Sequence, residues 1–237
     1  SSLGVTLWAE GEQLRFKAAA GALTDALRMQ LREHKEALLA HVRAREALTQ
    51  HDEAGRYLPF EVTDLQLAYL VGRNSAYELG GVGCHSYIEL RLPELDPDRL
   101  AWAWRQLVER HDMLRAVFLP DARQQVQREV TLPALHVANW RGLDAAEQTR
   151  RWTALRNEMS HRCYNPQCWP LFDVRLSQLD AGVILHFSID LLIADFASIQ
   201  ILLGELAQMC EHPKQPLPAL PLTFRDVMRA RQAQRHD

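Results

Sequence analysis

The segment GVILHFSIDLLIADFASIQILLGELAQMC, residues 182–210, decides how the rest of the sequence is interpreted. Its apolar stretch, Val183 to Ala207, is long enough to span a bilayer. Asp190, Asp195 and Glu205 interrupt it, however, and each would cost about 2.5–3.5 kcal/mol at the centre of a membrane. We therefore interpret the segment as a buried strand that ends at Asp190, a polar loop, and a buried helix over Ser198–Cys210. No membrane partner is expected.

Outward from this segment, strand patterns with period two alternate with amphipathic helix patterns. Helices are predicted to begin near residues 63, 96 and 144, and strands are predicted at residues 84–92, 113–119, 124–130 and 171–179. Strands that alternate with helices predict an α/β fold class.

A smaller region precedes this one. Alternating apolar residues on both sides of a Glu-Gly-Glu turn (GVTLWAEGEQLRFKA, residues 4–18) predict a β-hairpin. A helix should then begin at its N-cap Thr24, and it either continues to about Ala47 or breaks near His34. The chain is thus predicted to consist of a small region 1–47, a linker 48–57 without a sustained apolar period, and a larger region 58–237.

The charge balance and the cysteines exclude several classes of protein. The 237 residues carry 27 basic and 30 acidic side chains, a formal net charge of −3. A domain that grips phosphates usually shows a marked basic excess, so no nucleic-acid partner is expected. Cys163 and Cys168 lie near His161, but a structural zinc site usually needs a second close ligand pair, so no metal is predicted. Scattered cysteines favour reduced thiols and a cytoplasmic location.

The sequence DLLIADFAS, residues 190–198, is the first candidate site. An unpaired buried carboxylate is costly, so Asp190 and Asp195 should either reach solvent in a cleft or meet a cation. The structural alternative is that Asp195 or Ser198 caps the helix that follows.

The sequence RHDMLRAVF, residues 110–118, is the second candidate. Arg115 in an apolar strand needs an acidic partner, and Asp190 or Asp195 is the nearest candidate in the pattern. The alternative is that Arg115 lies on a solvated strand face.

From Leu58 onward, these segments resemble in order the N-terminal half of a heterocyclization domain of a non-ribosomal peptide synthetase. LPFEVTDLQLAYLVGR resembles the opening motif, including its Gln66, Tyr69 and Arg73 positions. RHDMLRAVF resembles the second motif, and TFRDV, residues 223–227, resembles a segment at the end of the first lobe.

DLLIADFAS matches the pattern D-x-x-x-x-D-x-x-S, which separates heterocyclization domains from ordinary condensation domains. Ordinary condensation domains carry H-H-x-x-x-D-G there, and their second His is usually held to be catalytic; in this chain Leu191 occupies that position. The resemblance assigns Asp190, Asp195 and Ser198 as catalytic, Arg115 as a structural ion partner, and Gln66, Tyr69 and Arg73 as tunnel or motif residues.

The resemblance implies a chloramphenicol-acetyltransferase-like fold built of two lobes, of which the larger region would be the first. Such a domain joins an upstream acyl thioester to a Cys, Ser or Thr and cyclodehydrates the product to a thiazoline or oxazoline. Both substrates arrive on phosphopantetheine arms of upstream and downstream carrier proteins, and no cofactor is bound directly.

Residues 4–18 and 23–42, within the small region 1–47, resemble a docking domain of the tubulysin type. In that family a β-hairpin binds the acidic C-terminal tail of an upstream synthetase subunit by strand addition. Arg15 and Lys17, which alternate on one strand, would meet such a tail; the alternative is that they are solvated. The family's first helix would precede Gly4.

Two functional expectations follow from the resemblance. We expect the chain without a second lobe to be inactive, and we expect Asp195 to be mainly architectural through a buried pair with Arg115. The competing hypothesis is a pure docking module for an upstream peptide. An acetyltransferase-like enzyme is disfavoured because H-H-x-x-x-D-G is absent, and His186, the one His in the preceding strand, is more typical of a core or surface residue.

Overall fold

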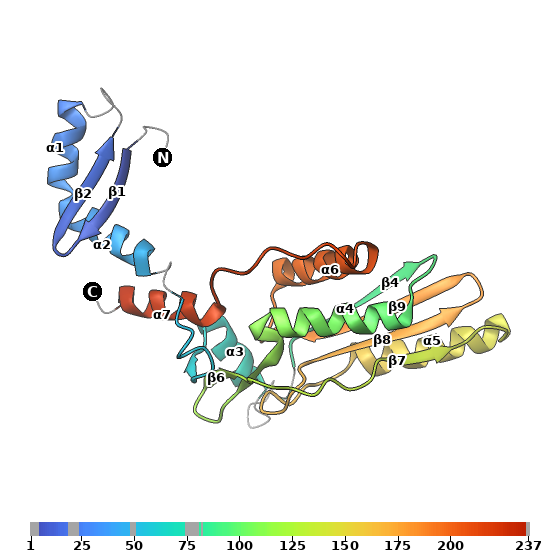
Figure 1. The fold of residues 1–237 in the computed structure, drawn as a ribbon. Coiled ribbons are helices and arrows are strands. Elements are labelled where there is room, and N and C mark those ends of the chain that lie inside the picture. The colour runs from blue at the N-terminus through green and yellow to red at the C-terminus, as the bar shows by residue number, and fades with distance from the viewer. Residues whose placement is uncertain (1–4, 19–23, 48–50, 74–80, 82, 236–237) are drawn as a thin grey trace. The chain divides into compact units, whose positions relative to one another are not determined.

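The computed structural model describes residues 5–18, 24–47, 51–73, 81 and 83–235. It separates into two compact units (Figure 1). Unit 1 contains residues 1–54 and 221–237, and unit 2 contains residues 55–220. This division differs from the predicted linker 48–57 and lobe 58–237, because the segment after Leu220 packs with the N-terminal region. Residues 48–50 of the predicted linker lie outside the described part.

Unit 1 opens with the predicted hairpin. Strands β1 (Val5–Glu10) and β2 (Gln13–Ala18) pair antiparallel across a turn in which Gly11 has a φ of +59°. A residue without Cβ suits this left-handed conformation, which explains the glycine at the turn. The expectation about a helix before Gly4 concerns residues outside the described part.

Two helices follow, and the predicted alternative of a break near His34 is confirmed. Helix α1 (Asp25–Glu33) begins at the N-cap Thr24, whose side chain accepts a hydrogen bond from Leu27 N at 3.3 Å. Helix α2 (Lys35–Ala47) packs against β1 and, on another side, against α7 (Phe224–Arg235).

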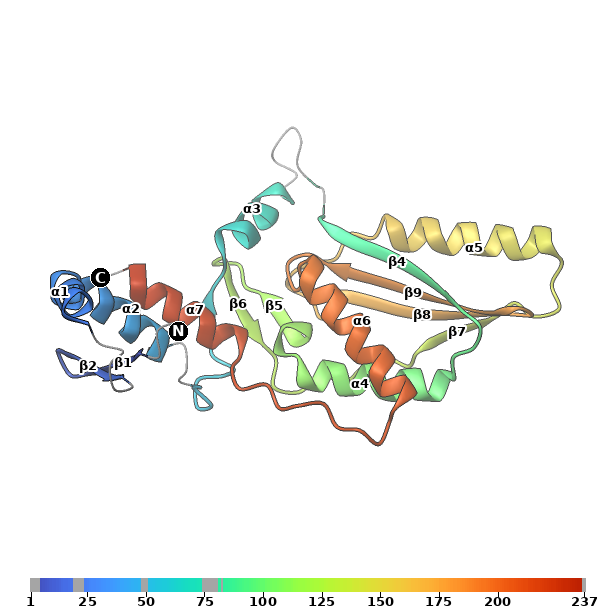
Figure 2. The same cartoon turned by 90° about the horizontal axis from the view of Figure 1, so that it is seen from above.

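Unit 2 is built on a four-stranded sheet (Figure 2). Its strands are β4 (His85–Leu92), β9 (Gly182–Asp190), β8 (Phe172–Leu179) and β7 (His136–Asn139), in that order across the sheet. All neighbours are antiparallel except β7 and β8, which are parallel.

Helices cover both faces of this sheet. Helices α4 (Pro97–Arg110) and α6 (Phe196–Glu211) lie on one face and α5 (Ala145–Ser160) on the other (Figure 2). The main core lies on the α4 and α6 side, where Leu107 and Leu202 meet Phe187 of β9. Trp140, Leu155 and Met159 form a smaller cluster on the α5 side. None of the helices in the described ranges is long and apolar enough to cross a membrane.

A second, three-stranded sheet joins β3 (Phe60–Glu61), β6 (Arg123–Val126) and β5 (Ala116–Phe118). Helix α3 (Asp64–Gly72) follows β3. The predicted strand over residues 113–119 is shorter in the structure, because its first part is the 3₁₀ turn η1 (Asp112–Arg115). In this turn the side chain of Arg115 reaches back to α4, which an extended strand would prevent.

Candidate active site

The end of strand β9 places Asp190 in the interior of unit 2. Its side chain is 1 % exposed and its two oxygens each accept a hydrogen bond of 2.6 Å from the Arg73 NH2 group. One of these oxygens also accepts from Leu192 N at 2.9 Å. Burial raises the pKa of the Asp190 carboxyl, while the Arg73 guanidinium and the Leu192 amide act against that rise. Asp190 is therefore paired with a cation and does not reach solvent.

Arg73, the C-cap residue of α3, provides that cation. Only 8 % of its side chain is exposed, and its NH1 group donates to Tyr164 O at 2.9 Å. One guanidinium thus joins the end of α3, the end of β9 and the chain before β8. The sequence singled out Arg73 by resemblance alone, because nothing in its spacing points to a residue 117 positions away.

Gln66 connects helix α3 to the loop that follows β9. Its backbone N–H donates to Thr63 Oγ1 as part of a capping box, and its own side chain donates to Leu192 O at 2.7 Å. It also exchanges hydrogen bonds with the buried amide of Gln124. Tyr69, the third motif residue of α3, is partly buried against the main core. The helix therefore holds the loop after β9 from its first and last turns.

Asp195 and Ser198 lie at the N-terminus of α6 and bond to each other. Asp195 is the N-cap, and its Oδ1 accepts from Ser198 N at 2.8 Å and from Ser198 Oγ at 2.7 Å. These two bonds lower the pKa of the exposed Asp195 carboxyl. The expectation of a buried pair between Asp195 and Arg115 is wrong, whereas the alternative of a helix cap is what the structure shows.

Replacing Asp195 with alanine is expected to lower the free energy of unfolding by about 1 kcal/mol, because one N-cap is lost. Asparagine caps about as well as aspartate, so the Asp195→Asn variant should stay within roughly 0.3 kcal/mol of the parent. Urea unfolding of the three proteins measures this. A loss of about 3 kcal/mol or more in the alanine variant would instead indicate a buried ion pair.

Arg115 is a structural ion partner, but of a different residue from the one predicted. Its NH2 group donates to Asp112 Oδ1 at 2.7 Å, three positions earlier in the sequence. Its NH1 group donates to the carbonyls of Val108 and Glu109, and its Nε donates to Gln127 O. Pairing with Asp190 or Asp195 is therefore wrong, because the turn η1 directs Arg115 to the C-terminal end of α4.

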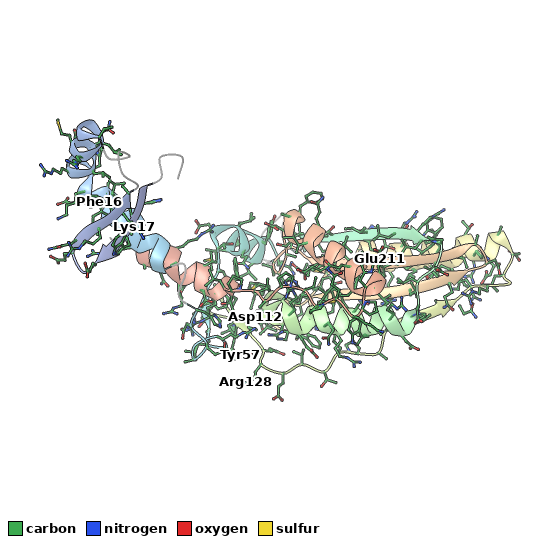
Figure 3. All side chains as sticks on the ribbon, turned by 45° about the horizontal axis from the view of Figure 1, so that its top comes forward. Phe16, Lys17, Tyr57, Asp112, Arg128 and Glu211 are labelled. Atoms are coloured by element: carbon green, nitrogen blue, oxygen red, sulfur yellow. The ribbon has the colours of Figure 1, made fainter. Side chains whose placement is uncertain are left out.

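Asp112 is the centre of this second cluster, and sequence reasoning missed it. Besides Arg115, it accepts two hydrogen bonds from Arg56, at 2.7 and 2.9 Å. Figure 3 labels Asp112 in unit 2, together with Tyr57 and Arg128. The spacing of three residues between Asp112 and Arg115 in RHDMLRAVF was the available signal.

His186 is a core residue on the α5 face of the sheet. It is fully buried, with Tyr87 OH at 2.8 Å from Nδ1 and Ser177 Oγ at 3.0 Å from Nε2. Burial lowers its pKa to about 4, so the ring is neutral near pH 7. Next to it, burial raises the pKa of Glu89, but hydrogen bonds from Arg156, Tyr87 and Trp152 outweigh this and hold it at about 2. This network fixes α5 on the sheet.

The candidate docking residues lie on the hairpin of unit 1. Arg15 faces Trp8 across the strand pair and forms an exposed ion pair with Glu10 at 2.6 Å. Lys17 faces Thr6 on the same face of the hairpin, and Figure 3 labels it beside Phe16. Both basic side chains are exposed.

The four cysteines are free thiols. Within residues 5–18, 24–47, 51–73, 81 and 83–235, no three His, Cys, Asp or Glu side chains gather where they could hold a metal ion.

Comparison with protein families identifies the class of protein. Residues 81–237 match the condensation domain model, and residues 1–43 match the model of the TubC N-terminal docking domain. The chain belongs to the condensation domain family. This confirms the predicted order, a docking domain followed by the first part of a condensation-type domain of a non-ribosomal peptide synthetase.

Individual relatives narrow this class. Pyochelin synthetase PchF of Pseudomonas aeruginosa is 36 % identical over 232 residues, which is 98 % of this chain and 13 % of that protein. Phenyloxazoline synthase MbtB of Mycobacterium tuberculosis is 34 % identical over 180 residues, 74 % of this chain and 12 % of that protein. The chain therefore spans about an eighth of the curated relatives it matches.

Among solved structures, the EpoB cyclization-docking bidomain of a non-ribosomal peptide synthetase from Sorangium cellulosum is similar along the whole chain. It is 34 % identical, with a TM-score of 0.77, and the match covers 100 % of this chain and 48 % of that chain. The similarity to a bidomain of the same two parts supports both the mixed α/β fold and the domain order.

Proposed function

We propose that unit 2 is part of a heterocyclization domain. This domain condenses an upstream carrier-bound acyl thioester with a carrier-bound Cys, Ser or Thr and then cyclises and dehydrates the amide. The observation that carries the proposal is the segment DLLIADFAS. It has Leu191 where an ordinary condensation domain has its His, and Asp190 is held by Arg73. The match along the whole chain to a cyclization-docking bidomain supports the same assignment.

Within this function, Asp190, Asp195 and Ser198 act through the shape of the loop that joins β9 to α6. Asp190 fixes the start of the loop on Arg73, and the Asp195–Ser198 pair fixes its end on α6. Gln66 holds the middle through Leu192 O. We propose that these are positioning residues, which keep the residues between them in one arrangement at the site. The phosphopantetheine of the carrier proteins then brings the reacting groups.

The test is a reconstitution of the complete synthetase subunit that contains this sequence. Its upstream carrier is loaded with an acyl thioester and its downstream carrier with Cys, Ser or Thr. The masses of the released products are then measured by mass spectrometry. The expected product lacks one water relative to the linear amide. A linear amide as the only product in all three reactions would contradict heterocyclization. The isolated chain is expected to release neither product.

Unit 1 is proposed to bind the C-terminal peptide of an upstream synthetase subunit, because residues 1–43 match a docking domain. Exposed Arg15 and Lys17 on one face of the hairpin suit an acidic peptide. Titration of that peptide measures the binding, and the Lys17→Glu variant should weaken it. Equal affinity of the parent and the variant would exclude this face of the hairpin.

A further inference from the structure

A buried carboxylate in unit 1 joins two segments that are far apart in the sequence. The side chain of Asp226 is 0 % exposed. It accepts hydrogen bonds from Thr223 N at 2.9 Å, Thr223 Oγ1 at 2.8 Å and Asp52 N at 3.1 Å, and it lies 2.8 Å from His51 Nδ1. Burial raises the pKa of Asp226, but the bonds from His51 and Thr223 outweigh this and hold the pKa at about 2.

A second carboxylate makes the same connection in the other direction. Asp52 Oδ2 accepts from Arg225 NH1 at 2.8 Å and from Arg229 NH1 at 2.7 Å. Each of the two segments, residues 51–52 and residues 223–229, thus supplies a carboxylate that accepts hydrogen bonds from the other segment. We call the set of His51, Asp52, Thr223, Arg225, Asp226 and Arg229 the clasp.

The clasp lies beside the apolar packing of α7. Helix α7 packs on α2, and Leu39 and Val42 of α2 and Ala230 of α7 are all buried. Opening the clasp would leave the Asp226 charge without its partners from the 51–52 segment, and an ion of this kind that loses its partners in a buried site is costly. The contacts therefore hold α7 in unit 1, although the matched docking model ends at residue 43 and the condensation model includes residues 224–235.

We propose that α2, the 51–52 segment and α7 form one cooperative unit, held together by the packing of α7 on α2 and by the clasp. The chain passes from unit 1 to unit 2 after Ala54 and returns to unit 1 after Leu220.

Hydrogen exchange of the full chain, followed by mass spectrometry, tests this proposal. The Asp226→Asn variant should exchange about ten-fold faster over residues 35–47 and 224–235, because the loss of one charge-assisted network is worth a factor of this order. Residues 172–190 of the lobe should not change. The matched control is Asp121→Asn, an exposed acid paired with Arg123 in the lobe, which should leave both unit 1 segments as in the parent.

Two results would overturn the proposal. One is unchanged exchange over residues 224–235 in the Asp226→Asn variant, and the other is acceleration there without any over residues 35–47. Because Asp226→Asn removes a buried charge, a milder variant is measured beside it. Arg229→Gln removes one bond from a side chain that is half exposed, and it should accelerate the same two segments by about two-fold, in line with the small effect of exposed pairs.

The pH dependence of the exchange gives an independent measurement. His51 lies between Asp226 and Glu53, and its hydrogen bonds with Asp226 first and Glu53 second raise its pKa above 6.5. Asp52, Arg225 and Arg229 are the other charged groups of the clasp. A raised pKa means that the contribution of His51 is complete below pH 6.5 and is lost as the pH rises through the folded-state value. After correction for intrinsic exchange rates, the protection of α7 amides against exchange should fall as the pH rises above 6.5 in the parent but not in the His51→Gln variant. Equal pH dependence in the two proteins would count against the clasp.

Discussion

Replacing Arg73 with methionine is expected to lower the free energy of unfolding of unit 2 by about 3–5 kcal/mol, the usual result of removing one partner of a buried ion pair. The reason is that the Asp190 carboxyl loses both of its bonds to the guanidinium, at a place where 1 % of its side chain is exposed. Methionine fills a similar volume, so little of the loss comes from a cavity. Urea unfolding followed by tryptophan fluorescence measures the change.

The design includes two further proteins. Arg123→Met removes an arginine whose ion pair with Asp121 is about half exposed, and it should cost much less stability than Arg73→Met, because exposed ion pairs contribute little. The double variant Arg73→Met with Asp190→Asn should be more stable than Arg73→Met alone, because no unpaired charge remains. If Arg73→Met cost no more than Arg123→Met, the buried pair would not hold α3 to the end of β9.

Replacing Arg115 with methionine is expected to cost a similar amount, about 3–5 kcal/mol. The loss has two sources. Asp112 loses one of its two cationic partners, and the carbonyls of Val108 and Glu109 at the C-terminal end of α4 lose their donor. Lysine carries the charge but lacks the planar fork, so Arg115→Lys should recover only a part of the stability. Thermal and urea unfolding of both variants measure these differences.

Arg128→Met is the matched control for Arg115. The guanidinium of Arg128 is exposed and lies 4.5 Å from the ring centre of Tyr57, a contact worth about 0.5–1 kcal/mol at exposed sites. Arg115 and Arg128 both belong to unit 2, so both variants report on the same unfolding transition. Full stability of Arg115→Lys would mean that charge alone, and not the cap on α4, is what Arg115 contributes.

Local patterns predicted most elements of the fold. Strands β8 and β9 and the helices α4, α5 and α6 all lie within a few residues of where periodicity and N-cap residues placed them. The cap at Asp195 was available from sequence for the same reason, because a cap depends only on neighbours within one helical turn.

The pairings between residues far apart in the sequence could not be predicted from the spacing of residues along the chain. Asp190 pairs with a residue 117 positions earlier, and only the resemblance had singled out Arg73. The strand pattern around Arg115 favours a distant acid over the nearer Asp112, because a strand turns residues three apart to opposite faces, whereas the 3₁₀ turn of the structure brings these two together. The place of α7 depends on Asp52 and Asp226, whose pairing across 174 residues leaves no periodic signal.

The assignment of α7 to unit 1 has a consequence for the construction of hybrid synthetases. In topological terms the lobe is an insertion between the second and third helices of unit 1. A junction placed at the end of α2 would therefore transplant two helices and leave the third behind, packed on a foreign α2. Exchanging residues 1–54 together with residues 221–235 keeps every one of these contacts within a single parent sequence.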